Sequence, residues 1–399
     1  MIVKGSLISA IGPAIPTPDG ARIVEGKGAT LMPGMIDVHV HLTFSALTEP
    51  QLLAPDLTPQ SAEAAAAVQA KAMLLRGFTA VRDMGGPAFG LKAGIDAGKY
   101  QGPRIWPSGA VISQTSGHGD FRLPNERSRR FFGKPSRAED LGATFIADGR
   151  DEVLTATREN LRFGASQIKL MAGGGSSSEY DPLDVTQYLP EEISAAVAAA
   201  EDWGTYVAVH AYTPRAVRRA LEAGVKSIEH GQLLDEATIQ LIGTRGAWLS
   251  LQNLPPPLPS DPPERLANKM KVREGSDHAW AWAKKYRVKL AWGTDFLFRP
   301  EENREQNAYI LKLKQWFTPA EILKIVTHDN AQLLALSGER SPYKGKLGVV
   351  EVGALADLIL VDGDPIADID LIADPDRNFR AIMKNGVFYR EPASPRRGP

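Results

Sequence analysis

Apolar segments alternate with stretches of helical spacing from residue 35 to about residue 330, and this alternation restricts the fold more than any other feature of the chain. The segments are apolar at nearly every position, which is typical of parallel strands buried on both faces of a sheet. The expected strands are MIDVHVHL (35–42), FTAVRDMG (78–85), RIWPSGAVIS (104–113), QIKLMA (167–172), YVAVHA (206–211), SIEHG (227–231), AWLSLQ (247–252) and KLAWGTD (289–295). Helices are expected at 61–76, 89–97, 152–163, 190–203, 214–222, 236–242 and 263–285, and from about 302 and 319.

Eight strand–helix units are the number that closes a (β/α)8 TIM barrel, an α/β fold. The alternative is an open doubly wound sheet, which needs a Gly-rich phosphate-binding turn after its first strand. No such turn follows the first expected strand, and the glycines at 173–175 lack the spacing of a dinucleotide or P-loop motif. We therefore expect a barrel domain over residues 33–343, interrupted by a long polar insertion at about 117–148.

The two ends of the chain have a different pattern, with short apolar runs broken by Pro and Gly. The first twelve residues predict a small hairpin that turns at Gly5, and Asn385–Gly386 is a strong signal for another tight hairpin. We expect residues 1–32 and 344–399 to pair with each other as one small β-sandwich domain beside the barrel.

Composition excludes several classes of protein. The net charge is −1 and no basic stripe is present, so neither nucleic acid nor an anionic membrane is an expected partner. No apolar run approaches the roughly 18 residues of a membrane-spanning helix. The chain has 7 His and 0 Cys, so disulfides and thiolate ligands are excluded. A metal site must therefore use His, carboxylates or a modified Lys.

Localisation and assembly are only weakly constrained by the sequence. No charged segment followed by an apolar stretch opens the chain, so we expect no signal peptide. The chain as it stands is expected to be cytoplasmic, and a missing upstream segment would make a periplasmic or secreted protein the alternative. A homo-oligomer is the default expectation.

Ligand-type side chains stand at the ends of successive expected strands. Active sites of such barrels lie at the carboxyl ends of the strands, and alternate residues of a strand share a face, so the two histidines of MIDVHVHL point the same way. The candidates are His39, His41, Lys169, His210, His230 and Asp295.

Each candidate also has a structural explanation. His210 suits the packed core of a barrel, His230 suits a pairing with Glu229, and Asp295 suits a cap on the next helix. Lys169 is harder to explain in this way, because a charged amine inside a parallel strand costs several kcal/mol unless it is paired or neutralised. Ligand types at five strand ends together favour a metal site.

Five motifs in order, LMPGMIDVHVHL, IKLMAGGG, VAVHAY, IEHG and WGTD, resemble the metal-binding motifs of the amidohydrolase superfamily. The resemblance covers essentially the whole chain and includes GVVEVGALADLILVDGDP, which is similar to the sandwich segment of imidazolonepropionase-like members. The lysine of IKLMAGGG resembles that of a binuclear branch with Xaa-Pro dipeptidases, aryl-amino-acid carboxypeptidases and ochratoxin-hydrolysing amidases.

The resemblance implies two zinc ions, or similar divalent metals, bridged by an N6-carboxylated Lys169. A buried lysine has a lowered pKa, and its neutral amine can add carbon dioxide. A hydroxide between two ions roughly 3.5–4 Å apart then attacks an amide carbonyl, and Asp295 moves the proton to the leaving nitrogen. The implied ligands are His39, His41 and Asp295 for the first ion, and His210 and His230 for the second.

Two further residues are similar to groups that contact the scissile carbonyl in the dipeptidase branch. They are His118 and Tyr212, which we expect to form an oxyanion clamp. A flexible-loop histidine and a packing aromatic are the alternatives. Arg82 and Asp83 are expected to form a structural ion pair near the site, and His278 and His328 lie on expected helices without a catalytic role.

The expected substrate is a small-molecule amide or dipeptide whose hydrolysis releases a C-terminal amino acid, such as an N-acyl amino acid or an ochratoxin-type aryl amide. The backbone N–H groups of residues 173–178 are a candidate site for the substrate carboxylate. Phe121, Phe131, Phe132 and the Pro-rich loop at 255–263 suggest an apolar lid. The rival hypotheses are a cyclic amidase like imidazolonepropionase, a one-metal deaminase, and a non-enzymatic relative.

Overall fold

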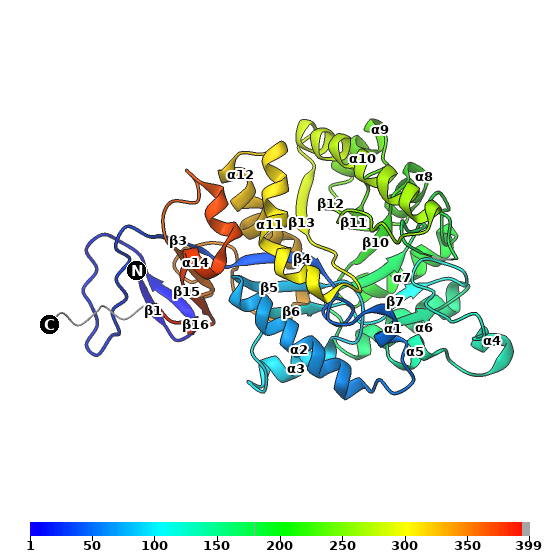
Figure 1. Ribbon diagram of the computed structural model, residues 1–399, viewed down its shortest axis with the longest axis horizontal. Helices are drawn as coiled ribbons and strands as arrows, with labels where there is room; N and C mark the ends of the chain where they lie inside the picture. The colour runs from blue at the N-terminus through cyan, green and yellow to red at the C-terminus, as the bar shows by residue number, and fades with distance from the viewer. Residues whose placement is uncertain (179, 393–399) are drawn as a thin grey trace.

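Two parallel sheets make up the centre of the protein in the computed structural model, which describes residues 1–178 and 180–392 (Figure 1). The smaller sheet consists of β4 (Met35–Val40), β5 (Phe78–Asp83) and β6 (Arg104–Pro107), in that order. The larger sheet contains β7 (Val111–Ser113), β8 (Thr144–Ile146), β9 (Ile168–Met171), β10 (Val207–Ala211), β11 (Ser227–His230), β12 (Trp248–Gln252) and β13 (Lys289–Gly293). Its order is β13-β12-β11-β10-β9-β7-β8. Every residue of β4, β5, β10, β11 and β12 is buried, which confirms the expectation from their apolar sequences.

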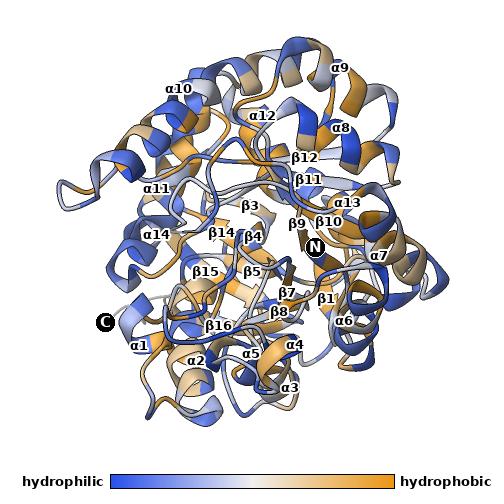
Figure 2. Ribbon diagram, turned by 90° about the vertical axis from the view of Figure 1, so that its right-hand side faces the viewer, coloured by the Kyte–Doolittle hydropathy of each residue, from blue (hydrophilic) through white to orange (hydrophobic). Residues whose placement is uncertain are grey.

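Helices follow the strands and lie around them (Figure 2). The longer helices are α2 (Pro59–Leu75), α3 (Phe89–Asp96), α6 (Arg150–Arg162), α7 (Pro190–Asp202), α8 (Pro214–Glu222), α9 (Glu236–Thr244) and α10 (Pro263–Lys285). The shorter ones are α1 (Glu49–Leu52), α4 (Arg129–Phe132), α5 (Arg137–Asp140), α11 (Gln306–Ile310), α12 (Pro319–Lys324), α13 (Asn330–Leu334) and α14 (Pro375–Asn378).

A Thr-Pro pair opens three of these helices, α2, α8 and α12. The side chains of Thr58, Thr213 and Thr318 each accept a hydrogen bond from a backbone N–H of the first turn. The proline that follows each threonine has the φ angle of a helix and lacks an N–H, which would find no partner at this position. These local signals explain why the helices begin where the sequence predicts.

The two parallel sheets adjoin at β4 and β13. The backbone N–H of Asp295 donates to the carbonyl oxygen of His39 at 2.8 Å. Asn330 Nδ2 donates to the carbonyl oxygens of Ile36 (2.7 Å) and Trp292 (2.8 Å), and Asn330 Oδ1 accepts from Trp292 N–H (3.0 Å). Asn330 thus holds together the strand with the paired histidines and the strand that leads to Asp295.

The sheets also meet at the start of β9. Gln167 Nε2 donates to the carbonyl oxygens of Asp83 (3.1 Å) and Trp106 (3.0 Å), which belong to β5 and β6. The backbone N–H of Ser166 donates to the carbonyl oxygen of Pro107 at 2.8 Å. The carboxyl ends of strands from both sheets are therefore brought to one side of the molecule.

Strands from the two ends of the chain pair with each other. β3 (Thr30–Pro33), β14 (Leu358–Val361), β15 (Phe379–Lys384) and β16 (Val387–Arg390) form an antiparallel sheet in the order β16-β15-β14-β3. The hairpin of β1 (Ile2–Lys4) and β2 (Leu7–Ala10) turns at Gly5 and bonds through Ile8 to Ala354 at 2.9 Å. Asn385 and Gly386, with φ of 57° and 75°, make the expected tight turn.

The structure differs from the expected elements in three places. The third expected strand is divided into β6 and β7, because the chain turns at Gly109 (φ 77°) after Pro107. The expected insertion is not wholly irregular, since β8 inside it pairs with β7. The helix expected from about 302 is a 3₁₀ segment, η1 (Pro300–Glu305), followed by the short α11.

Among the described residues, no helix combines the length and the apolar character needed to cross a membrane.

Candidate metal centre

Left-handed backbone at two strand ends directs side chains into the site. His230 has φ of 77° and Asp295 has φ of 56°, a conformation that costs a non-glycine residue roughly 1–2 kcal/mol. In a regular strand Glu229 and His230 would point to opposite faces. Here both reach the same centre, since Glu229 Oε2 lies 2.9 Å from His39 Nδ1 and His230 Nδ1 lies 3.9 Å from Asp295 Oδ2. Backbone strain of this kind is typical of functional sites.

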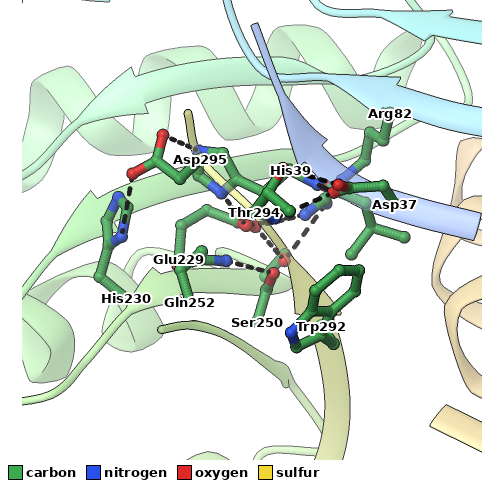
Figure 3. A network of polar contacts seen from close by, with 12 residues as sticks. Asp37, His39, Arg82, Glu229, His230, Ser250, Gln252, Trp292, Thr294 and Asp295 are labelled. Atoms are coloured by element: carbon green, nitrogen blue, oxygen red, sulfur yellow. Dashed lines mark hydrogen bonds and ion pairs between the residues drawn. The ribbon is translucent and has the colours of Figure 1, made fainter. Parts of the chain in front are cut away.

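Three imidazoles gather around the carboxylate of Asp295 (Figure 3). Asp295 Oδ1 lies 3.5 Å from His39 Nε2 and 3.3 Å from His41 Nε2. One ligand atom each from His39, His230 and Asp295 lies within 4.8 Å of the others. The structure therefore brings together the candidates from the first, sixth and last expected strands.

His39, His210 and His230 have imidazoles in the neutral state that a metal requires. Burial lowers the pKa of His39 and His210 well below the ordinary value, and that of His230 to about 3. A neutral imidazole keeps a free lone pair, and this form binds metals. Within the described residues, His39 Nε2 and His230 Nδ1 are buried without a hydrogen-bond partner. These orphaned nitrogens and the nearby carboxylate fit a divalent metal ion.

Lys169 and His210 lie at the same centre. The Lys169 side chain is 1% exposed, and none of the described residues accepts a hydrogen bond from its amine. Burial lowers the pKa of Lys169 to about 8, although Glu229 and Asp295 partly oppose this effect. The ring of His210 contacts that of His230 at 4.4 Å between centroids, and its Nε2 lies 3.1 Å from the carbonyl oxygen of Gly174. A buried lysine with a lowered pKa fits a carboxylated bridging ligand.

Glu229 is a functional residue that the sequence interpretation missed. Its carboxylate contacts His39 Nδ1 and accepts hydrogen bonds from Arg82 Nη2 at 2.8 Å to each oxygen. Ser227 Oγ donates to it at 2.6 Å. A carboxylate behind a metal-binding imidazole fixes its tautomer and orientation. The only signal in the sequence was a glutamate directly before His230.

The expected ion pair between Arg82 and Asp83 is wrong. Consecutive strand residues point to opposite faces, so Arg82 reaches Glu229 on another strand while Asp83 turns away. The Asp83 carboxylate instead accepts hydrogen bonds from the backbone N–H groups of Leu42 (2.8 Å) and Gly85 (3.1 Å). It fixes the chain just beyond His39 and His41.

His118 and Tyr212 also reach the centre. The His118 ring stacks on His210 with 3.9 Å between centroids, and the Tyr212 ring lies 5.0 Å from His210. His118 Nδ1 lies 2.6 Å from Ser178 Oγ and 3.5 Å from Asp181 Oδ2. Ser178 and Asp181 were not anticipated, although both lie in the segment that follows the glycine run.

Two of the N–H groups in the expected carboxylate site at residues 173–178 are not free. The N–H of Gly174 donates to Val185 O at 3.2 Å, and that of Gly175 donates to Asp181 Oδ2 at 2.6 Å. Both donors are therefore used to hold the loop itself.

All eight residues proposed from the sequence line one cavity of about 530 Å³: His39, His41, His118, Lys169, His210, Tyr212, His230 and Asp295. Phe121 and the start of the Pro-rich loop line it too, but Phe131 and Phe132 do not. Phe131 is 78% exposed, on the tip of the insertion, so this part of the expected lid is wrong. His278 and His328 lie on helical segments away from the cavity.

Comparisons with known proteins show the family of this chain. A family model described as the amidohydrolase family matches residues 30–388. Ochratoxinase from Aspergillus niger is 30% identical over 382 residues, which is 91% of this chain and 76% of the relative. A solved prolidase complexed with N-methylphosphonate-L-proline superposes with a TM-score of 0.88 at 33% identity, covering 98% of this chain and 94% of that one. A Xaa-Pro dipeptidase with bound methionine gives a TM-score of 0.80 at 28% identity, covering 97% and 94%.

The family match covers most of the chain and includes every residue that lines the centre. This chain therefore belongs to the amidohydrolase family.

Proposed function

We propose that this hydrolase acts on an amide or peptide bond whose cleavage releases a C-terminal amino acid. The observation that carries the proposal is the cluster of imidazoles around Asp295, in which His39 Nε2 and His230 Nδ1 are buried without a hydrogen-bond partner among the described residues. The similarity to an ochratoxinase, a prolidase and a Xaa-Pro dipeptidase supports this class of substrate.

The proposed cofactor is a pair of zinc ions bridged by N6-carboxylated Lys169. When bound, the ions polarise the amide carbonyl and lower the pKa of a water molecule. The buried amine of Lys169 supports carboxylation because a substantial neutral fraction exists near pH 8. The proposed ligands are His39, His41 and Asp295 on one side and His210 and His230 on the other, with Lys169 between them.

The chain's own groups move the protons and hold the substrate. Asp295 lies within 4 Å of three imidazoles, and its Oδ1 lies 3.3 Å from His41 Nε2. We assign it the proton transfer from water to the leaving nitrogen. His118 and Tyr212, on the His210 side, are assigned to the carbonyl oxygen of the substrate.

The architecture that supports this site is proposed to be one closed (β/α)8 barrel at 33–343, with the chain ends at 1–32 and 344–399 as a β-sandwich domain. Hydrogen bonds from Asn330 at β4 and β13, and from Gln167 at the start of β9, support closure at both junctions of the two sheets. A homo-oligomer stays a proposal, which light scattering of the purified protein tests.

The experiment uses metal-replete protein and a panel of N-acyl amino acids and Xaa-Pro, Xaa-Arg and Xaa-Phe dipeptides, with amino-acid release as the readout. We expect release that favours one C-terminal residue, about two metals per chain, and loss of activity in Asp295→Asn, which keeps the size of the side chain. If no substrate of the panel releases an amino acid although two metals are bound, the proposed release of a C-terminal amino acid is wrong. Cyclic amides are then the next substrates to test. Full activity of a folded, metal-free protein overturns the metal site.

A further inference from the structure

Three phenylalanine rings from distant parts of the chain meet at the cavity. Phe44 follows β4, Phe121 lies between β7 and α4, and Phe298 follows β13. The ring centroids of Phe44 lie 5.8 Å from those of both Phe121 and Phe298, and the last two are 6.1 Å apart. These separations are those of packed aromatic groups. All three residues line the cavity, and we call them the aromatic wall.

The aromatic wall begins directly beside a proposed metal ligand. The Phe44 ring stacks on His41 with 5.5 Å between centroids and 18° between planes. Phe44 is 1% exposed, whereas Phe121 and Phe298 are half-buried. Phe298 has φ of 58°, and its N–H donates to the carbonyl oxygen of Phe44 at 2.8 Å. Phe298 thus has a strained backbone, and its ring is held in the aromatic wall next to the candidate metal centre.

Contacts between imidazole rings form a row that runs from one end of the site to the other. Ring contacts run from His41 to His39 (5.3 Å), from His39 to His230 (5.0 Å) and from His230 to His210 (4.4 Å). The aromatic wall touches this row at His41. His118 stacks on the row at its other end, His210, with Ser178 and Asp181 behind it.

An amide that releases an amino acid has one charged side and one acyl side. A free carboxylate against aromatic rings would lose its hydration without a compensating hydrogen bond, which is costly. The end of the row at His210 has the polar side chains of His118, Ser178 and Asp181. The end at His41 has the three phenylalanine rings of the aromatic wall. The two sides of such a substrate therefore match the two ends of the row.

We propose that the aromatic wall of Phe44, Phe121 and Phe298 binds the acyl side of the substrate and selects an aromatic acyl group over a small one. This inference rests on the proposed function, since it assigns a direction to the same amide in the same cavity. It makes Phe121 and Phe298 specificity-determining residues of the site.

The test compares N-acetyl, N-benzoyl and N-cinnamoyl derivatives of the one amino acid that the panel above releases fastest. We expect kcat/KM for the aromatic acyl groups to exceed that for acetyl by at least about tenfold, within the range that apolar pockets achieve. Phe121→Ala and Phe298→Ala should lower kcat/KM for the aromatic substrates by about 10- to 100-fold and lower it less for the acetyl substrate, so that the preference for aromatic acyl groups falls. Phe131→Ala, on the same insertion but outside the cavity, is the matched control and should behave as wild type.

A second measurement requires no variant and decides the matter if Phe298→Ala does not fold. Benzoate should inhibit the wild-type enzyme at a concentration at least about tenfold lower than acetate, because it occupies the acyl side alone. Equal kcat/KM for acetyl and benzoyl substrates overturns the inference and leaves the proposed function intact. A preference that survives in both alanine variants, or that follows the amino acid instead of the acyl group, also overturns it. Failure of every substrate, acetyl included, overturns the proposed function itself.

Discussion

Nδ1 of His39 lies 2.9 Å from Oε2 of Glu229, so an imidazole from the first strand of the site is held by a carboxylate from β11. The same carboxylate pairs with the buried guanidinium of Arg82 at 2.8 Å. Both side chains of this ion pair are fully buried. Glu229 therefore links the orientation of a proposed metal ligand to the charge balance of the core beneath it.

Glu229→Gln should weaken metal binding about 10- to 100-fold, as is typical when the partner behind a metal-binding histidine is changed. The amide keeps the size of the side chain but removes the charge that faces Arg82. Breaking one partner of a buried pair typically costs about 3–5 kcal/mol, so the free energy of unfolding should fall as well. Chelator competition and denaturant unfolding measure the two effects. A folded variant that binds metal as tightly as wild type would show that this contact does not tune the site.

Lys169→Ala should lower activity by more than about 100-fold, since even residues behind the ligands are worth 10- to 100-fold. The buried amine has a pKa lowered by burial to about 8, so the alanine side chain replaces a group that is costly to bury in its charged form. The variant should therefore fold, and a short carboxylic acid added to the buffer should restore part of the activity by replacing the carbamate oxygens. The measurement is amino-acid release with and without formate or acetate. Normal activity without rescue would exclude a carboxylated Lys169.

The sequence predicted most strands, most helices and candidate residues for the centre because each depends on local pattern: apolar runs, helical spacing and ligand types at strand ends. It did not predict contacts across the interior. The pairing of Arg82 with Glu229 joins residues far apart in the chain, and the left-handed φ of His230 breaks the alternation on which strand arguments rely. The aromatic wall was only partly visible, since Phe44 and Phe298 are unremarkable until the loops after β4 and β13 meet.

Lys384 makes stability depend on pH. Its amine donates to the carbonyl oxygen of Gly102 at 2.6 Å, and burial, aided by Arg104, lowers its pKa to about 8 from 10.5. Between these two values the unfolded chain binds more protons than the folded one, so stability should rise with pH. The full effect is about 3 kcal/mol. Urea unfolding from pH 7.5 to 10.5 should show this slope relative to Lys384→Met, whereas Lys4→Met, at an exposed site, should keep it. Parallel curves for wild type and Lys384→Met would contradict the assignment.

Asn330 and Asn307 are both buried and each donates two hydrogen bonds to backbone carbonyls, but only Asn330 joins β4 to β13. Because a hydrogen bond contributes about 1 kcal/mol and an unpaired buried carbonyl costs more, either alanine variant should lower the free energy of unfolding by about 2–4 kcal/mol. Asn330→Ala should in addition weaken metal binding, since these strands position His39 and Asp295. Denaturant unfolding and chelator competition on both variants separate the effects. Equal metal affinity in the two variants, at equal loss of stability, would show that the junction of the sheets supports the fold without positioning the ligands.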